Sequence, residues 1–185
     1  MGTYEELVSE CTKMIAQDGL SAFSLRRLAD RVGIKAPSIY VHFKDKEALL
    51  LEARHLAFSR LSKALAKADK GRSDRKRLIA TAMGYMQFAQ DEPTLFAFLF
   101  AQTPSQRLDI ASPPSPDSPY ALLTSRVQDF LGGSDQEVEI LSFGIWSMVH
   151  GSAMLRQTHL RGVSAPYVTG VQKNLEALLD GWTNK

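Results

Sequence analysis

The chain has 185 residues, of which 44% are hydrophobic and 23% are charged. This balance is typical of a globular protein with a buried core, and it excludes a disordered or fibrous chain. The formal net charge is only +2, but residues 22–46 and 56–77 are strongly basic, whereas the residues after 77 are acidic overall. This uneven distribution indicates a polyanionic partner at one end of the molecule.

The sequence has the features of a cytoplasmic protein without membrane association. No apolar run approaches the roughly 18 residues that a membrane span needs, and the first residues lack the charged and then apolar order of an export signal. The single cysteine, Cys11, shares a helical face with Leu7, Val8 and Ile15. We therefore expect Cys11 to lie in the core rather than to act as a reactive thiol.

Helical periodicity dominates the chain. Apolar residues recur at three- and four-residue spacing in nearly every segment, and no alternating strand pattern is flanked by hairpin turn residues. The sequence therefore predicts an all-α fold with about nine helices. In chain order, these are expected over residues 3–17, 24–33, 36–42, 45–70, 74–90, 94–101, 120–131, 135–160 and 165–182.

One segment departs from this pattern. Residues 104–119 contain five prolines and four serines, a composition that does not sustain a helix. We expect a mobile surface loop. The sequence leaves open whether this loop is a lid, a docking segment for a partner or a disordered stretch.

A helix-turn-helix motif is predicted over residues 24–43. Ser24 is suited to cap the first helix, Ala29 allows a second helix to cross closely, and Gly33 tolerates the backbone of the turn. Apolar side chains then fill the space beneath the motif, namely Leu25, Leu28, Val32, Ile34 and Ile39.

The outward face of this motif carries groups suited to DNA. Short and hydrogen-bonding side chains fit a major groove, and a cation in the first turn of a helix favours a phosphate. Tyr40 and Lys46 are expected to bind phosphates, as are two arginines of the first motif helix. The predicted DNA-binding residues are Arg26, Arg27, Lys35, Ala36, Pro37, Ser38, Tyr40, His42 and Lys46.

Residues 4–55 resemble the tetracycline-repressor (TetR) family of bacterial transcription regulators. The matching residues are Ser24, Leu28-Ala29, Val32-Gly33-Ile34, Ser38-Ile39-Tyr40-Val41-His42-Phe43 and Lys44-Asp45-Lys46-Glu47-Ala48-Leu49. The resemblance implies a helix-turn-helix DNA-binding domain over residues 1–55 and a helical ligand-binding and dimerisation domain over residues 56–185. It also implies a homodimer that binds a palindromic operator, usually as a repressor, and releases it when a small molecule binds. The run Trp146-Ser147-Met148-Val149-His150-Gly151 is similar to a tryptophan, histidine and glycine motif of one subgroup.

The last two helices have more than one apolar face, which favours a second copy of the chain as the packing partner in a four-helix bundle. Gly144, Ser147 and Gly151 would allow close approach of another helix. The residues expected at the dimer interface are Val138, Leu141, Ile145, Met148, Ser152, Val168, Val171, Leu175, Leu178 and Trp182.

Aromatic and methionine side chains in the C-terminal part are candidates for an effector site, although such stripes often belong to the core. They favour an apolar or flat ligand, with His150 as the expected polar contact. The predicted ligand-binding residues are Met83, Met86, Phe88, Phe96, Phe100, Tyr120, Trp146, His150 and Met154.

Other classes of function have less support. The phosphate-binding glycine loop, the nucleophile elbow and the histidine or cysteine metal motifs are missing, so we expect neither an enzyme nor a cofactor or metal. One alternative stays open: a DNA-binding dimer without an effector, controlled by a protein partner.

Overall fold

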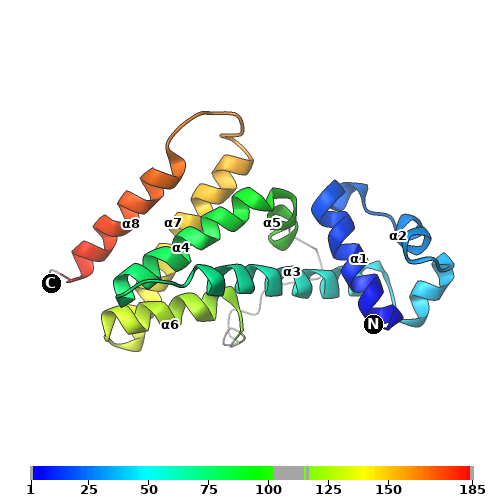
Figure 1. Ribbon diagram of the computed structural model, residues 1–185, viewed down its shortest axis with the longest axis horizontal. Coiled ribbons are helices and arrows are strands. Elements are labelled where there is room, and N and C mark those ends of the chain that lie inside the picture. The colour runs from blue at the N-terminus through cyan, green and yellow to red at the C-terminus, as the bar shows by residue number, and fades with distance from the viewer. Residues whose placement is uncertain (1, 102–114, 116, 184–185) are drawn as a thin grey trace. The chain divides into compact units, whose positions relative to one another are not determined.

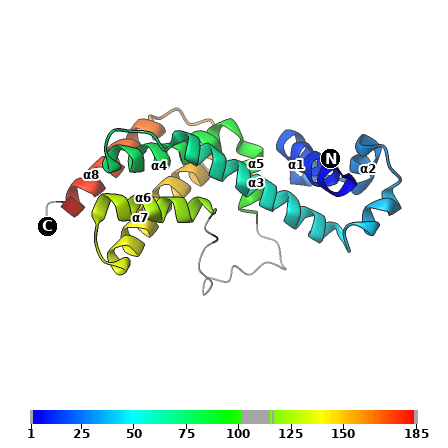
Figure 2. The same ribbon diagram turned by 60° about the horizontal axis from the view of Figure 1, so that its bottom comes forward.

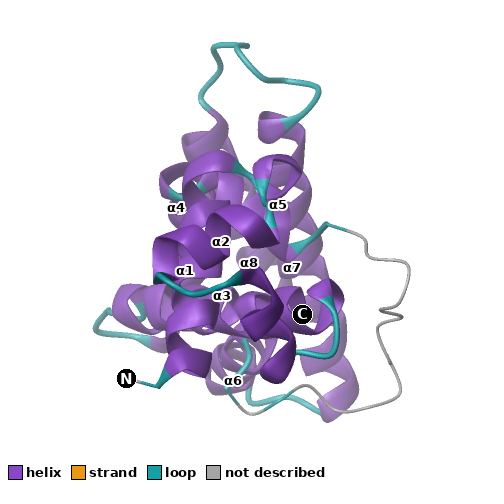
Figure 3. Ribbon diagram, turned by 90° about the vertical axis from the view of Figure 1, so that its right-hand side faces the viewer, coloured by secondary structure: helices purple, strands orange, loops and turns teal. Residues whose placement is uncertain are grey.

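The computed structural model describes residues 2–101, 115 and 117–183, and within these residues every regular element is a helix (Figures 1 and 3). This confirms the predicted all-α fold. Most of the proline- and serine-rich segment 104–119 lies outside the described residues. The elements are α1 (Thr3–Asp18), the 3₁₀ turn η1 (Leu20–Ala22), α2 (Leu25–Val32), the 3₁₀ helix η2 (Ala36–Val41), α3 (Lys46–Ala68), α4 (Asp74–Asp91), α5 (Pro93–Leu99), α6 (Pro119–Leu131), α7 (Asp135–Gln157) and α8 (Tyr167–Thr183).

Local capping chemistry explains where several helices begin and end. The Ser24 hydroxyl accepts a hydrogen bond from the Arg27 amide at the start of α2, and Ser134 forms a capping box with Glu137 at the start of α7. Gly33 ends α2 in the left-handed conformation, with φ of 78°. The short helix expected over residues 36–42 is present as a 3₁₀ helix.

The chain forms two compact units that are discontinuous in sequence. Met1–Arg60 and Glu92–Asp109 belong to the first unit, and Leu61–Asp91 and Ile110–Lys185 belong to the second. A single boundary between residues 55 and 56 therefore does not describe the division, because the chain returns to the first unit to form α5. Helix α3 contributes residues to both units.

In the first unit, α5 packs against α1. Leu95, Phe96, Phe98 and Leu99 of α5 are buried, as is Cys11 of α1, which agrees with the expected core position of the cysteine. Burial raises the pKa of the Cys11 thiol to about 12, so the thiol stays protonated and unreactive near neutral pH.

In the second unit, α4 contacts α6, α7 and α8 (Figures 1 and 2). Leu78, Ala82 and Met86 of α4 are buried, as are Leu141 and Ile145 of α7. These helices therefore share one apolar core around α4.

A close approach between α3 and α4 depends on a glycine. A Cβ atom at Gly84 would lie only 2.5 Å from the Cβ of Ala68, a separation that two carbon atoms do not tolerate. Glycine is therefore the residue that lets these two helices pack at this distance.

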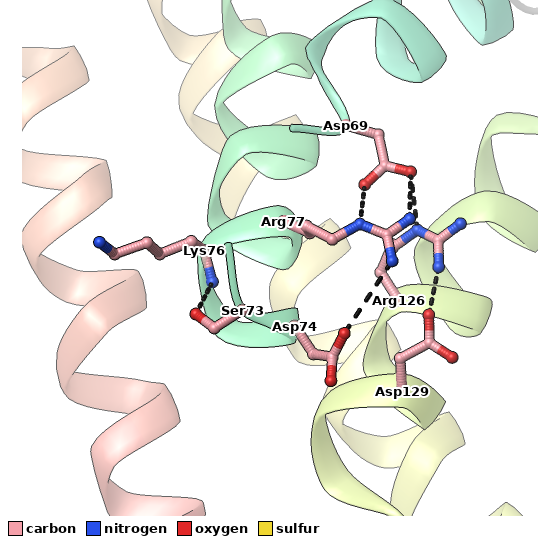
Figure 4. Close-up of polar contacts among 7 residues, drawn as sticks. All are labelled: Asp69, Ser73, Asp74, Lys76, Arg77, Arg126 and Asp129. Atoms are coloured by element: carbon pink, nitrogen blue, oxygen red, sulfur yellow. Dashed lines mark hydrogen bonds and ion pairs between the residues drawn. The ribbon is translucent and has the colours of Figure 1, made fainter. Parts of the chain in front are cut away.

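Two arginines converge on one carboxylate at the turn between α3 and α4 (Figure 4). Asp69 accepts hydrogen bonds from Arg77 at 3.2 and 3.0 Å and from Arg126 of α6 at 2.9 Å. Arg126 also pairs with Asp129. These charge-assisted hydrogen bonds tie the α3–α4 turn to α6. The Asp69 side chain that accepts them is only 10% exposed.

Helix α7 is unusually apolar. By length and composition, α7 alone among the described helices could cross a membrane. An 18-residue stretch of α7 has a mean hydropathy of 1.3, and 33% of that stretch is buried. Core helices of soluble proteins pass the same test, and α7 contacts α4, α6 and α8. Helix α7 therefore has more apolar surface than the rest of the chain covers, which indicates a second packing face.

Candidate functional site

The helix-turn-helix motif is built from α2, the Gly33 turn and η2. Ala29 is buried where α2 contacts η2, and Ile39 and Phe43 are buried beneath the segment that follows. The amide of Ile34 donates to the Ala29 carbonyl at 3.0 Å, which closes the turn. These contacts hold residues 35–43, which we call the recognition segment, on the surface of the first unit.

The exposed residues of the recognition segment are largely those predicted from the sequence. Tyr40 is 57% exposed. Lys35, Pro37, Ser38 and His42 are also exposed, whereas Ala36 is half-buried. Val41 was not among the predicted DNA-binding residues, yet its side chain is 81% exposed. Its outward direction follows from the burial of Ile39 and Phe43, two residues to either side.

Lys46 begins α3, where free backbone amides and the helix dipole favour an anion. Asp45 caps this end by accepting a hydrogen bond from the Ala48 amide at 2.7 Å. The Lys46 ammonium lies 5.4 Å from the centre of the Phe23 ring, a cation–π distance that orients the side chain. Lys46 remains exposed, so its charge is accessible to a phosphate.

The two arginines predicted to bind phosphate differ in their surroundings. Arg26 is exposed. Arg27 donates to the Asp18 carboxylate at 2.7 Å and to the Ala22 carbonyl at 3.0 Å. Arg27 therefore has a structural role in joining α2 to the end of α1, which the sequence did not indicate.

Two arginines of α3 hold the two ends of α5. Arg60 pairs with Glu92 at 2.5 Å, just before α5, and Arg54 donates to the Ala101 carbonyl at 3.0 Å, just after it. The Arg54 guanidinium also lies 5.1 Å from the centre of the Phe98 ring, and burial lowers the pKa of Arg54. These contacts fix α5 in the core of the unit that carries the recognition segment.

The predicted ligand-binding residues are divided between the two units. Phe96 and Phe100 belong to the first unit, where Phe100 contacts the rings of Phe96 and Phe58. The remaining seven lie in the second unit: Met86 and Phe88 are buried, and Met83, Tyr120, Trp146, His150 and Met154 are half-buried.

Four of the side chains in the second unit form an aromatic cluster, which consists of Tyr85, Tyr120, Trp146 and His150. Tyr85 and His150 Nδ1 share a hydrogen bond of 2.8 Å. The Trp146 ring lies 5.6 Å from the His150 ring and 5.8 Å from the Tyr120 ring, measured between centroids. The cluster joins α4, α6 and α7 through rings that carry hydrogen-bonding atoms.

Burial sets the protonation states within this cluster. It raises the pKa of Tyr85, against a smaller lowering by a side-chain hydrogen bond with Trp146. It lowers the pKa of His150. Both groups are therefore neutral at pH 7, which suits contact with an uncharged aromatic ligand.

The structure changes the expected dimer interface. Val138, Leu141, Ile145, Val171 and Leu175 are buried within a single chain, so they are not available to a second copy. Met148, Ser152, Leu178 and Trp182 are half-buried, and Val168 is 37% exposed. Periodicity identified the apolar faces of α7 and α8 but not which face its own chain covers.

The other side of α7 is exposed and apolar. Ile140 is 55% exposed, Phe143 59% and Leu155 48%, and a Cβ atom at Gly144 or Gly151 would meet no neighbour within 4 Å. We call Ile140, Phe143, Gly144, Gly151 and Leu155 the outer face of α7. Within the described residues, no three His, Cys, Asp or Glu side chains gather as metal ligands.

Two family models match this chain, one in its N-terminal part and one in its C-terminal part. The family model for bacterial regulatory proteins of the tetR family matches residues 7–53. A model for the tetracyclin repressor-like C-terminal domain matches residues 78–178, more than half of the chain. The first of these covers the helix-turn-helix motif.

Related proteins agree with these matches. The uncharacterized HTH-type transcriptional regulator YobS of Bacillus subtilis is 22% identical over 83% of this chain and 78% of its own. The tetracycline repressor protein class C of Escherichia coli is 37% identical, over 25% of this chain and 21% of its own.

Solved structures share the fold. A protein of unknown function from Rhodococcus sp. RHA1 has a TM-score of 0.77 at 23% identity, covering 98% of this chain and 96% of that one. A TetR-family regulator from Haemophilus influenzae has a TM-score of 0.62 at 20% identity, covering 96% and 94%. The solved structures share the fold, and the two family matches show that the chain belongs to the TetR family of helix-turn-helix, DNA-binding transcriptional regulators.

Proposed function

We propose that the protein is a homodimeric repressor that binds a palindromic operator and leaves it when a small apolar or aromatic effector binds. The observation that carries this proposal is the set of exposed side chains in the recognition segment, together with exposed Lys46 at the start of α3. One such segment reads only a few base pairs, and a two-fold symmetric dimer places two of them about 34–36 Å apart on successive turns of DNA. Its place of action is the cytoplasm.

The roles of the DNA-binding residues follow from their chemistry. Lys35, Ala36, Pro37, Ser38 and His42 face base edges in the major groove. Tyr40, Lys46 and Arg26 bind phosphates, which sets the register without reading sequence. Arg27 is not carried into the proposal, because its guanidinium is already bound to Asp18 and Ala22.

The outer face of α7 supports the homodimer. Large side chains such as Phe143 and Ile140 are rarely left together in water on a monomer, and the neighbouring glycines allow two helix backbones to approach closely. Two copies of α7 packed through this face, with α8 of each chain beside them, form a four-helix bundle. Because the same surface serves both copies, the interface is two-fold symmetric.

The aromatic cluster of Tyr85, Tyr120, Trp146 and His150 supports the effector. Rings offer flat apolar contact area, and the neutral His150 imidazole offers one hydrogen bond. For release, the effector must bind the conformation that does not fit the operator more tightly than the one that does. The run around Trp146 and His150 is similar to a motif of one family subgroup, and we expect the chain to belong to that subgroup.

The experiment that tests this function selects bound fragments from the source genome and footprints them with wild-type protein. Tyr40→Ala and Tyr40→Phe are run beside it, since Tyr40→Phe removes only the hydroxyl. We expect a palindromic footprint with the wild type, and weaker binding of all sequences alike with both variants. If no fragment is enriched even at low salt, the proposed function is wrong.

A further inference from the structure

Val41 is the most exposed of the large hydrophobic side chains in the part of the chain that the structure describes, at 81%. Single exposed apolar residues are common on proteins and need no special explanation. Val41 differs through its position, because it lies between Tyr40 and His42 in the recognition segment, and both of these neighbours are also exposed.

The backbone directs Val41 away from its own chain. Ile39 is 1% exposed and Phe43 4%, and the Phe43 amide donates to the Ile39 carbonyl at 3.0 Å, so these two anchors lie one turn apart. Val41 is midway between them in sequence and lies on the opposite side of the segment. Pro37, one turn earlier, is exposed as well.

The partner that fits this side chain is an apolar group on a base edge. The thymine 5-methyl is the apolar group that base pairs present in the major groove, and the other edge groups are hydrogen-bond donors and acceptors. A β-branched side chain has a restricted χ1, so Val41 offers two methyl groups in a fixed direction with little loss of entropy on binding.

We propose that Val41 is a specificity-determining residue that contacts the 5-methyl group of a thymine in each half of the operator. The inference rests on the proposed function, because it requires the recognition segment to enter the major groove. It adds a defined readout, since the contact distinguishes thymine from uracil as well as from the other bases. Two-fold symmetry then gives two equivalent thymines in each operator.

The test uses the full chain and a duplex that it selects from the genome. Each symmetric pair of thymines is replaced in turn by uracil, which keeps the base pairing and removes only the methyl groups. At one pair we expect wild-type affinity to fall about three- to fivefold per methyl group, the effect of losing one buried apolar carbon.

The variant Val41→Ala completes the cycle. It is expected to bind the thymine duplex more weakly by a similar factor and to lose its sensitivity to uracil at that pair. Because Val41 is exposed, Val41→Ala should keep the helical circular dichroism and the Tm of the wild type. Val163→Ala, at a valine that is 52% exposed in the second unit, is the matched control and should keep the wild-type pattern.

The outcomes separate the inference from the function on which it rests. If the wild type binds its operator and Val41→Ala is as sensitive to uracil as the wild type at every position, Val41 does not read a methyl group. An equal loss on all duplexes with Val41→Ala, without methyl dependence, indicates contact with the sugar-phosphate backbone and also overturns the inference. Failure of the wild type to select any duplex overturns the proposed function itself.

Discussion

Lys46 and His150 show how the surroundings of one side chain decide what it does. Lys46 is exposed at the start of α3 beside Phe23, so its charge remains available to an external anion. His150 is half-buried among Tyr85 and Trp146, so its charged form is disfavoured.

Replacing Lys46 by alanine should weaken binding to all DNA sequences alike. The dimer loses one phosphate contact in each half of the operator and releases about two counterions fewer, so the slope of log K against log salt should become less steep by about 1.8. Fluorescence anisotropy over a salt series measures this slope. Lys173→Ala, at an exposed lysine of α8, is the control, and an unchanged slope with Lys46→Ala would remove the phosphate assignment.

His150 should make the stability of the protein depend on pH. Burial lowers its pKa from the ordinary value of 6.5, so below about pH 6.5 the unfolded chain binds a proton that the folded chain does not. The free energy of unfolding should therefore decrease as pH falls from about 6.5 toward the lower folded pKa. Because the ring is partly exposed, we expect an effect of less than about 1 kcal/mol.

Urea unfolding between pH 7.5 and 5 measures this dependence. His150→Gln should flatten it, whereas His159→Gln, at an exposed histidine of the same unit, should not. A wild-type pH profile in His150→Gln contradicts the assignment.

At the scale of elements, close contacts explain the arrangement of the helices within each unit. Arg54 and Arg60 of α3 bind the two ends of α5, and Asp69 joins the α3–α4 turn to α6 through Arg126. Gly84 lets α4 approach α3. These are contacts between distant parts of the sequence, so each depends on the fold as well as on local propensity.

Gly84→Ala should destabilise the protein by about 1–3 kcal/mol, because the added Cβ would overlap that of Ala68. Gly170→Ala is the matched control: Gly170 also lies in a helix, but an added Cβ meets nothing within 4 Å. Helix propensity predicts that Gly170→Ala is neutral or stabilising by up to about 1 kcal/mol. Thermal melts of both variants compare the two, and equal Tm changes would contradict the close packing of α3 and α4.

At the scale of the whole molecule, the outer face of α7 determines the proposed assembly. Phe143→Glu places a charge in this face without disturbing the core, because Phe143 is 59% exposed in the single chain. We expect folded monomers in sedimentation equilibrium and much weaker operator binding, since one recognition segment alone contacts half of the site.

Two further variants make the dimer experiment specific. Val163→Glu, at an exposed valine outside this face, should leave the dimer intact. Leu175→Glu should instead unfold the second unit, because Leu175 is fully buried within its own chain. A dimer that survives Phe143→Glu would locate the interface elsewhere.

Much of this protein follows from local signals in the sequence. The Ser24 cap, the Gly33 turn and the spacing of Ile39 and Phe43 act within a few residues of one another, so the sequence by itself determined the helices and the helix-turn-helix motif. The expected exposure of Tyr40 and Lys46 follows from the same spacing. Helical periodicity was sufficient here because each of these helices has one apolar face.

Only the tertiary structure decided which apolar face is covered and which segments share a core. Helix α7 has apolar residues on two sides, and periodicity does not distinguish Ile145, which is fully buried, from Phe143, which is exposed. Phe96 lies in the first unit, where its ring contacts that of Phe100, because the chain returns to this unit after α4. Burial depends on contacts between distant residues, and these contacts exist only after the chain has folded.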